Sequence, residues 1–414
     1  MVSTRKRTWQ PAKGRAKEAW IVDYFDLNGT RRQKTFDKKK DADRFEEQVK
    51  QELRTGIHVA EADTITVKQA GANWITDCEQ LGLERSTRES YQTHLDLHIT
   101  PFIGELLLTK LNIPTIRNWQ KRLHDEGRSA NLIKRVTVDL GAILAVAQDG
   151  GFVARNVVYE SNSRVRAKKK KIEKRRTRKL GYGIDIPTHD EIRTIIDHTA
   201  PRHKPLMITL VFTGMRSSEI RGLPWSAVDF ERQCIRVSSR VDRYGVMGFT
   251  KSQEGQRTIR VPPIVINTLK EWKLQCPKGQ RDLVFPNGDG NLENHGNVIK
   301  RILHPAEIAG GVTVLKPKVD EEGNPILDER GEPIIETVAK YPGLHAFRHF
   351  FASWCINRKS AGGLELSAKE VQHRMGHSSI QQTMDTYGHL FPAVDEHESL
   401  AEASRHLLPA LRAT

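Results

Sequence analysis

The sequence lacks several features that would place it in common classes of protein. Its 414 residues include four cysteines, which lie far apart and form neither a Cys-x-x-Cys pair nor a Cys/His cluster. Scattered thiols argue against a zinc site and fit a reducing cytoplasm, so we expect them to pack as small hydrophobic side chains. The four are Cys78, Cys234, Cys276 and Cys355.

Long hydrophobic runs are also missing. No apolar run approaches the roughly 20 residues that span a bilayer. Residues 1–10 are basic and no apolar segment follows them, so we expect no signal peptide. The chain shows no P-loop pattern and no carboxylate or His/Cys cluster. The absence of these patterns agrees with a protein that needs no nucleotide, metal or other cofactor.

The chain does have a large excess of positive charge. Lysine and arginine number 66 against 51 aspartate and glutamate, which gives a formal net charge of +15. This indicates a polyanionic partner, either nucleic acid or an anionic membrane surface, unless the protein simply happens to be basic. The absence of membrane-spanning runs favours nucleic acid. The length suggests two or three domains.

Residues 1–60 are expected to form a small basic module. Two strand-like runs, residues 20–25 and 31–36, flank an Asn-Gly turn signal, and Asp37 is the predicted N-cap of a helix over residues 38–53. A unit this small suits DNA binding better than catalysis. The basic side chains assigned to DNA binding here are Arg31, Arg32 and Lys34.

Residues 64–160 are expected to form a compact helical domain. Thr66 and Ser86 are predicted N-caps, and Pro114 suits the first turn of a further helix. Apolar residues recur at helical spacing along much of this stretch, including Tyr91, Leu95 and Ile99.

Residues 161–180 differ sharply from their surroundings. Between residues 164 and 179 there are eleven lysines and arginines and a single acid, Glu173. Such a block cannot bury a core, so it is a linker or a nuclear-localisation signal. Basic modules on both sides favour a linker that lies along DNA. The residues assigned to that contact are Lys168, Lys169, Lys170 and Lys171.

Residues 181–414 are expected to form a larger, mixed α+β domain. Residues 320–327 recur as residues 328–335, each copy with a Gly-x-Pro turn signal, which predicts a surface hairpin or strand-turn insertion. The segment 396–411 is amphipathic, and packing on its own domain or on a neighbouring protomer are both open. The expected fold is thus multidomain and mainly α with small β parts.

Two clusters in this domain could bind a phosphate. In Thr-Gly-Met-Arg-Ser-Ser-Glu, a glycine turn leads into a helix start and places Arg216 in its first turn, where a bidentate donor meets the positive helix end. Taken alone, such an arginine is usually solvated or paired with Glu219. Lys251 lies near the tip of an apparent hairpin and could donate a proton to a leaving oxygen, although a lone tip lysine is usually a surface residue.

Two further clusters carry imidazoles and a phenol. His345 and Arg348 lie three residues apart, so a helix puts them on one face. His349 follows, and its role is either chemical or simply packing. His377 ends a Met-Gly-His triplet, and Tyr387 comes ten residues later. A phenol is a weak nucleophile at neutral pH unless cations stabilise the phosphorane that it forms.

The order of these clusters, Arg, Lys, His-x-x-Arg, Gly-His and Tyr, resembles the tyrosine recombinase (phage integrase) family over about residues 185–395. The resemblance implies a role for each position. Arg216 and Arg348 would clamp the scissile phosphate, with Glu219 supporting the arginine site. Lys251 would be the general acid toward the 5′-hydroxyl, and His345 would assist proton transfer. His377 would hydrogen-bond the phosphate, and Tyr387 would form the 3′-phosphotyrosyl bond.

The resemblance also implies an architecture and partners. Residues 1–60 would be an arm-type DNA-binding domain, 64–160 a helical, SAM-like core-binding domain, 161–180 the basic linker, and 181–414 the catalytic domain with its C-terminal tail. The partners would be core and arm attachment sites in double-stranded DNA, and other copies of the chain in a tetramer. A host bending protein and an excision directionality factor would assist, in a bacterial cytoplasm at the nucleoid.

Two other functions stay open at this point. One is a monomeric DNA-relaxing enzyme of the type IB topoisomerase kind, which uses similar residues. The other is a DNA-binding regulator without catalysis. The basic module at residues 1–60 favours a mobile-element integrase over the first, and a competent residue at every catalytic position argues against the second.

Overall fold

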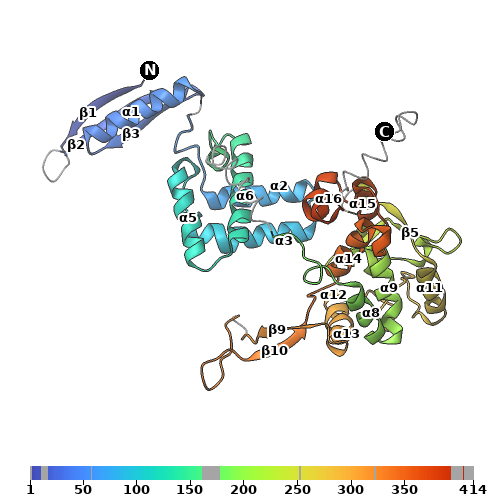
Figure 1. Ribbon diagram of the computed structural model, residues 1–414. Coiled ribbons are helices and arrows are strands. Elements are labelled where there is room, and N and C mark those ends of the chain that lie inside the picture. Colours follow the sequence, from blue (N-terminus) through green and yellow to red (C-terminus); the bar gives the residue numbers. More distant parts are fainter. Residues whose placement is uncertain are drawn as a thin grey trace, which may run out of the picture. The chain divides into compact units, whose positions relative to one another are not determined.

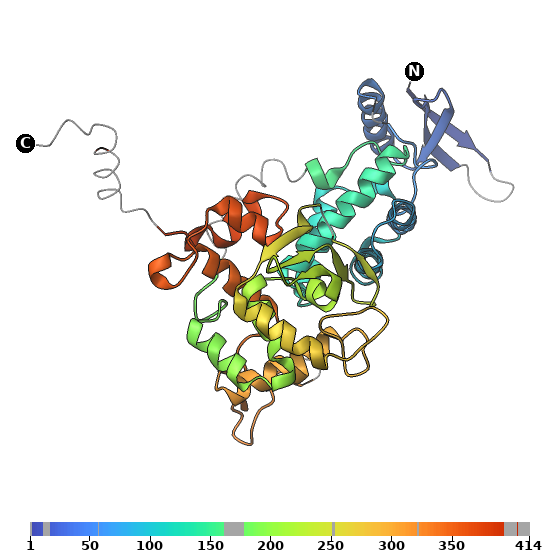
Figure 2. The same cartoon turned by 90° about the vertical axis from the view of Figure 1, so that its right-hand side faces the viewer.

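The computed structural model describes residues 2–10, 17–56, 58–160, 178–250, 253–320, 323–392 and 404. The chain divides into two compact units, Met1–Thr177 and Arg178–Thr414. In both units helices outnumber small antiparallel sheets (Figures 1 and 2). The expected fold, mainly α with small β parts, is confirmed.

The first unit begins with a three-stranded antiparallel sheet in the order β1-β2-β3. Its strands are β1 (Ser3–Trp9), β2 (Lys17–Phe25) and β3 (Arg31–Phe36), and α1 (Lys39–Arg54) packs against them. The predicted hairpin is β2 and β3. The predicted cap is wrong: Lys38, not Asp37, is the N-cap, because its carbonyl accepts the first helical N–H groups.

The rest of the first unit is helical around a core of its own. Its α-helices are α2 (Val67–Gln80), α3 (Arg85–His94), α4 (Thr100–Ile103), α5 (Ile113–Asp125) and α6 (Ala130–Asp149). Thr66 caps α2 with a capping box, as predicted. Ser86 caps nothing, because α3 already begins at Arg85 and the carbonyl of Glu84 accepts its first N–H groups.

The second unit is built on a core that helices and short strands share. Its α-helices are α8 (His189–His198), α9 (Lys204–Thr213), α10 (Ser217–Arg221), α11 (Pro263–Gln275), α12 (His295–Asn297), α13 (His304–Ala309), α14 (His345–Ile356), α15 (Ala368–Met375) and α16 (Ile380–Tyr387). The apolar α9 and α14 pack side by side in it. The predicted capping box of Thr188 and Glu191 begins α8.

Three small sheets complete the described part of the second unit. Strand β5 (Cys234–Val237) pairs with β4 (Val228–Asp229) and β8 (Arg257–Arg260), and β6 (Ser239–Val241) pairs with β7 (Met247–Phe249). The third sheet is a hairpin of β9 (Thr313–Pro317) and β10 (Ile335–Ala339), which projects from the body of its unit in both views.

The eight-residue repeat lies at the end of the β9–β10 hairpin, as an insertion of the predicted kind. In the first copy the Asp320 N–H donates to the Asn324 carbonyl, and in the second the Asp328 N–H donates to the Glu332 carbonyl. The two copies also form equivalent bridges, Val319 to Pro325 and Leu327 to Pro333. The sequence repeat is therefore a repeat of one turn.

Candidate active site

Arg216 is placed by the turn that joins α9 to α10. Gly214 ends α9 in the left-handed region (φ +57°), and a Cβ there would lie 2.4 Å from Phe351 on α14. Glycine thus allows this turn to approach α14 closely. Arg216 is the N-cap of α10, where its Nη1 donates to Glu219 Oε1 (2.7 Å) and its Nη2 to the Gly376 carbonyl (3.0 Å).

Arg348 lies on the first turns of α14, as the His-x-x-Arg spacing predicted. It is only 2% exposed, and its guanidinium donates to the carbonyls of Gly214 (2.6 Å) and Met375. Burial and the nearby cations Arg216 and Arg257 lower the pKa of Arg348 to about 9. The side chain therefore stays mostly charged at neutral pH, and its positive charge is poorly compensated.

A third arginine, Arg257 on β8, was not predicted from the sequence. Its side chain is fully buried, and it donates to Glu219 Oε2 (2.9 Å) and Oε1 (3.2 Å). Burial alone would raise the pKa of Glu219, but Arg257 and Arg216 together lower it to about 2. Glu219 is thus a buried carboxylate that fixes two guanidiniums.

His377 follows a tight end of helix α15. Gly376 has a φ of +60°, and a Cβ there would come within 2.9 Å of Arg257 Nη1. His377 Nδ1 lies 2.9 Å from Thr383 Oγ1, and its ring lies parallel to that of Tyr387, at 6.3 Å between centroids. Burial and then Arg348 lower the pKa of His377 to about 3, so the imidazole is neutral at pH 7.

Tyr387 is the last residue of α16 and is 1% exposed. Its hydroxyl lies 2.8 Å from Nδ1 of His349. Burial raises the pKa of Tyr387 to about 12, and the charges of Arg348 and Arg216 oppose that rise. The sequence left His349 undecided between chemistry and packing. The signal that could have found it is its place beside Arg348, on the face of α14 that carries His345.

A pocket of about 550 Å³ opens beside these side chains. Arg216, Ser217, His345 and His349 line it. The other polar residues on its wall are Asp185, His295, Lys340 and Tyr341, and the rest are apolar. Burial, then Arg348 and Arg216, lower the pKa of His345, and its ring meets the His349 ring edge-on at 4.5 Å. The pocket can therefore receive an anion against Arg216, with neutral imidazoles along its wall.

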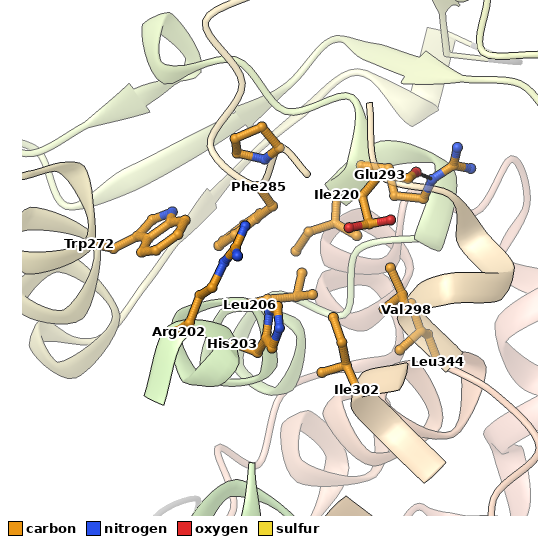
Figure 3. Close-up of a pocket in the computed structure, with 12 residues that line it drawn as sticks. Arg202, His203, Leu206, Ile220, Trp272, Phe285, Glu293, Val298, Ile302 and Leu344 are labelled. Atoms are coloured by element: carbon orange, nitrogen blue, oxygen red, sulfur yellow. Dashed lines mark hydrogen bonds between the residues drawn. The ribbon is translucent and has the colours of Figure 1, made fainter. Parts of the chain in front are cut away.

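A second pocket, shown in Figure 3, is much smaller, at about 20 Å³. Arg202 and Trp272 lie on one side of it, and Ile302 and Leu344 on the other. Because one water needs roughly 10–15 Å³ of such space, this pocket holds little more than a water molecule. It is too small to be a substrate site.

The chain matches the model of the phage integrase family over residues 187–393 and that of a phage integrase N-terminal SAM-like domain over residues 66–124. It belongs to the phage integrase family. The first match spans the arginines, the histidines and Tyr387. The second lies within the helical part of the first unit.

Relatives of this integrase-family chain are tyrosine recombinases and integrases. It is 25% identical over 370 residues to the tyrosine recombinase XerC-like protein of Caldanaerobacter subterraneus subsp. tengcongensis, covering 86% of each chain. Its fold is similar to the Tn1549 transposon integrase in complex with a circular intermediate DNA (TM-score 0.60, 18% identity, 83% of this chain and 100% of that one). A lambda integrase tetramer bound to a Holliday junction is also similar (TM-score 0.50, 17% identity, 87% and 94%).

The structure brings together six of the predicted site residues in the second unit. They are Arg216, Glu219, His345, Arg348, His377 and Tyr387. Lys251 falls outside the described residues, between β7 and β8. Lys168 to Lys171 and the amphipathic segment 396–411 also lie outside the described residues, apart from Ser404.

The three basic residues assigned to DNA binding on β3 all pair with carboxylates. Arg31 contacts Asp23, Arg32 contacts Asp26 (2.8 Å), and Lys34 contacts Glu61 (2.7 Å). The pairs of Arg31 and Lys34 are partly exposed and contribute little to stability. The partner of Arg32, Asp26, is buried.

The described residues contain neither a metal-binding cluster nor a membrane-spanning helix. No group of three or more His, Cys, Asp or Glu is placed there to hold a metal ion. In the same part of the chain, no helix is long and apolar enough to cross a membrane. The four cysteines carry free thiols; Cys78 and Cys355 are buried as expected, whereas Cys234 and Cys276 are only partly buried.

Proposed function

We propose that this chain is a tyrosine site-specific recombinase, an integrase of a mobile element, that cleaves and rejoins DNA through a 3′-phosphotyrosine at Tyr387. The observation that carries the proposal is the set of charged groups around the Tyr387 hydroxyl and the pocket beside it. A phenol lies buried in a region where the guanidiniums of Arg216 and Arg348 act on its charge, next to a pocket that admits an anion.

The mechanism follows from the charges at this site. Arg216 lines the pocket, and its side chain is 36% exposed, so it can contact a phosphate oxygen directly. Arg348 is buried on α14, and its poorly compensated charge favours a dianionic phosphorane over the monoanionic ground state. Fixed cations that meet developing charge in a dry site are the main source of such catalysis.

The remaining groups complete the reaction. Lys251 acts as general acid and protonates the 5′-oxygen as it leaves, and His377 donates a hydrogen bond to the phosphate. The phosphodiester energy is retained in the phosphotyrosine bond, so the 5′-hydroxyl of another strand can reverse the step without ATP. Exchange between two duplexes needs four such sites, hence a tetramer.

The proposal extends to the other parts of the chain. Residues 1–60 bind arm-type sites, residues 64–160 bind the core site, and the basic block 161–180 lies along the DNA between the core-binding part and the catalytic domain at 181–414. A host DNA-bending protein and an excision directionality factor act with the tetramer at the nucleoid of a bacterial cytoplasm.

The test uses a nicked suicide substrate built from the attachment site, which a short direct repeat in the flanks of the coding sequence would mark. Intact protein traps a covalent protein–DNA adduct, whereas Tyr387→Phe traps none and binds the DNA with nearly unchanged affinity. Tyr24→Phe is the control, since Tyr24 is also buried but lies on β2 and does not line this pocket. An adduct with Tyr387→Phe, or none with the intact protein, contradicts the proposal.

A further inference from the structure

We propose that His349, the residue after the arginine of the His-x-x-Arg cluster, takes the proton of the Tyr387 hydroxyl during attack on the phosphate. This inference rests on the proposed function, and it concerns a residue to which the resemblance gives no role. Its basis is a direct contact: Nδ1 of His349 lies 2.8 Å from the Tyr387 hydroxyl oxygen.

The geometry selects His349 among three nearby imidazoles. His377 presents its ring face to the Tyr387 ring, and its Nδ1 is engaged with Thr383. The ring of His345 packs edge-on against His349. In the described part of the chain, His349 is the side chain that hydrogen-bonds the Tyr387 hydroxyl.

The surroundings keep the imidazole of His349 neutral. Burial, His345 and Arg348 lower the pKa of His349 to about 4, and Asp185 opposes them. A neutral imidazole has one nitrogen free to accept a proton, and the tautomer with its hydrogen on Nε2 leaves Nδ1 as acceptor. The phenol, whose pKa burial raises, then donates its hydrogen to Nδ1.

The step balances without any further reactant. The phenolic O–H bond breaks, its proton moves to Nδ1, and the oxygen forms a bond to phosphorus. The P–O5′ bond breaks, and the general acid protonates the 5′-oxygen. The incoming phosphate adds negative charge beside His349, which favours the imidazolium. For religation the imidazolium returns its proton to the tyrosine oxygen.

The experiment measures the rate of adduct formation on the suicide substrate as a function of pH, for the intact protein and for three variants of His345 and His349. His349→Ala lowers the rate at neutral pH by about 10²-fold, the scale of general-base catalysis. Its rate then rises about tenfold per pH unit, because hydroxide must ionise the phenol instead. Thermal unfolding and DNA affinity report whether this variant is folded.

Two further variants separate proton transfer from positioning. His349→Asn can keep a hydrogen bond to the hydroxyl but cannot take the proton, so it shows the same steep pH dependence. His345→Asn lowers the rate but keeps the pH profile of the intact protein. A third test uses a substrate with sulfur in place of the 5′-oxygen, whose 5′-thiolate leaving group needs no proton. This substrate should restore the rate of Lys251→Ala but not that of His349→Ala.

The outcomes that overturn the inference are distinct from failure of the proposed function. If intact protein forms no adduct, the proposed function fails. If intact protein forms the adduct, three results each overturn the role of His349: an unchanged rate in His349→Ala, full activity in His349→Asn, or rescue of His349→Ala by the sulfur substrate.

Discussion

The carboxylate of Glu219 is the residue on which the arginine site depends. It is 2% exposed and contacts both Arg216 and the fully buried Arg257. Glu219→Gln leaves Arg257 as a buried cation without its counter-charge, which typically costs about 3–5 kcal/mol. We expect that loss in the free energy of unfolding at pH 7, measured by chemical denaturation, together with loss of cleavage.

The same residue predicts a pH dependence. Because the pKa of Glu219 falls from 4.5 to about 2 on folding, its contribution is complete above pH 4.5 and is lost as the pH falls toward 2. Glu219→Gln should therefore flatten the acid limb of the stability curve. Glu271→Gln, at an exposed position of α11, is the control and should leave that limb unchanged. Equal acid limbs for Glu219→Gln and the intact protein would contradict this account.

Gly376 gives a second prediction at the scale of one residue. Gly376→Ala combines a left-handed φ, which costs about 1–2 kcal/mol, with a Cβ only 2.9 Å from Arg257 Nη1. Gly362→Ala carries the φ penalty alone, since nothing lies within 4 Å of its Cβ position. Both variants should have a lower melting temperature than the intact protein, but only Gly376→Ala should lose cleavage. Normal cleavage by Gly376→Ala would show that Arg257 need not be fixed.

At this scale the sequence predicted local arrangements and missed distant ones. The caps at Thr66 and Thr188 involve partners three residues away, so spacing alone indicated them. Arg257 pairs with Glu219 only because β8 comes next to the start of α10 in the folded chain. The contact of His349 with Tyr387 likewise needs α14 and α16 in place.

Secondary-structure elements show a similar division. The hairpin β2–β3 and the repeat at residues 320–335 could be predicted because turn residues mark them. Strand β1 could not, since Ser3–Trp9 is charged and largely exposed and has no alternating apolar pattern. The predicted helical face of Tyr91, Leu95 and Ile99 contains a π-helix at Leu95–Ile99, just before Pro101, which lacks the N–H that a regular ladder requires.

The basic side chains of strand β3 are predicted to contact arm-type DNA. The triple variant Arg31→Gln, Arg32→Gln and Lys34→Gln should weaken binding to arm-type DNA and reduce its salt dependence, by about 0.9 in the log–log slope for each phosphate that the protein no longer neutralises. Cleavage of the core suicide substrate should be unchanged. Removal of residues 1–60 should have the same two effects. If the slope of log binding constant against log salt concentration is unaltered in the triple variant, residues other than these three contact the arm-site phosphates.

The whole chain is predicted to act as four copies. On a Holliday junction assembled from two attachment sites, light scattering should find four copies per junction, because each duplex in an exchange needs two active sites. A complex with one copy per duplex that still relaxes supercoiled DNA would instead favour the topoisomerase alternative.

The family and the overall fold class were predictable from the sequence because the site residues occur in a fixed order. The number of copies on DNA was implied by the resemblance alone.

The guanidinium of Arg348 is fixed by the main-chain carbonyls of Gly214 and Met375, and that of Arg216 by the Gly376 carbonyl together with the Glu219 carboxylate. A carbonyl is the same in every amino acid, so such a contact constrains only the path of the backbone. At Gly214 and Gly376 that path itself requires glycine, whereas at Met375 it does not. At Met375, neutral substitution can change the side chain to suit the core without moving the arginine. At this position the catalytic centre therefore depends on the course of the main chain and not on the side chain that it carries.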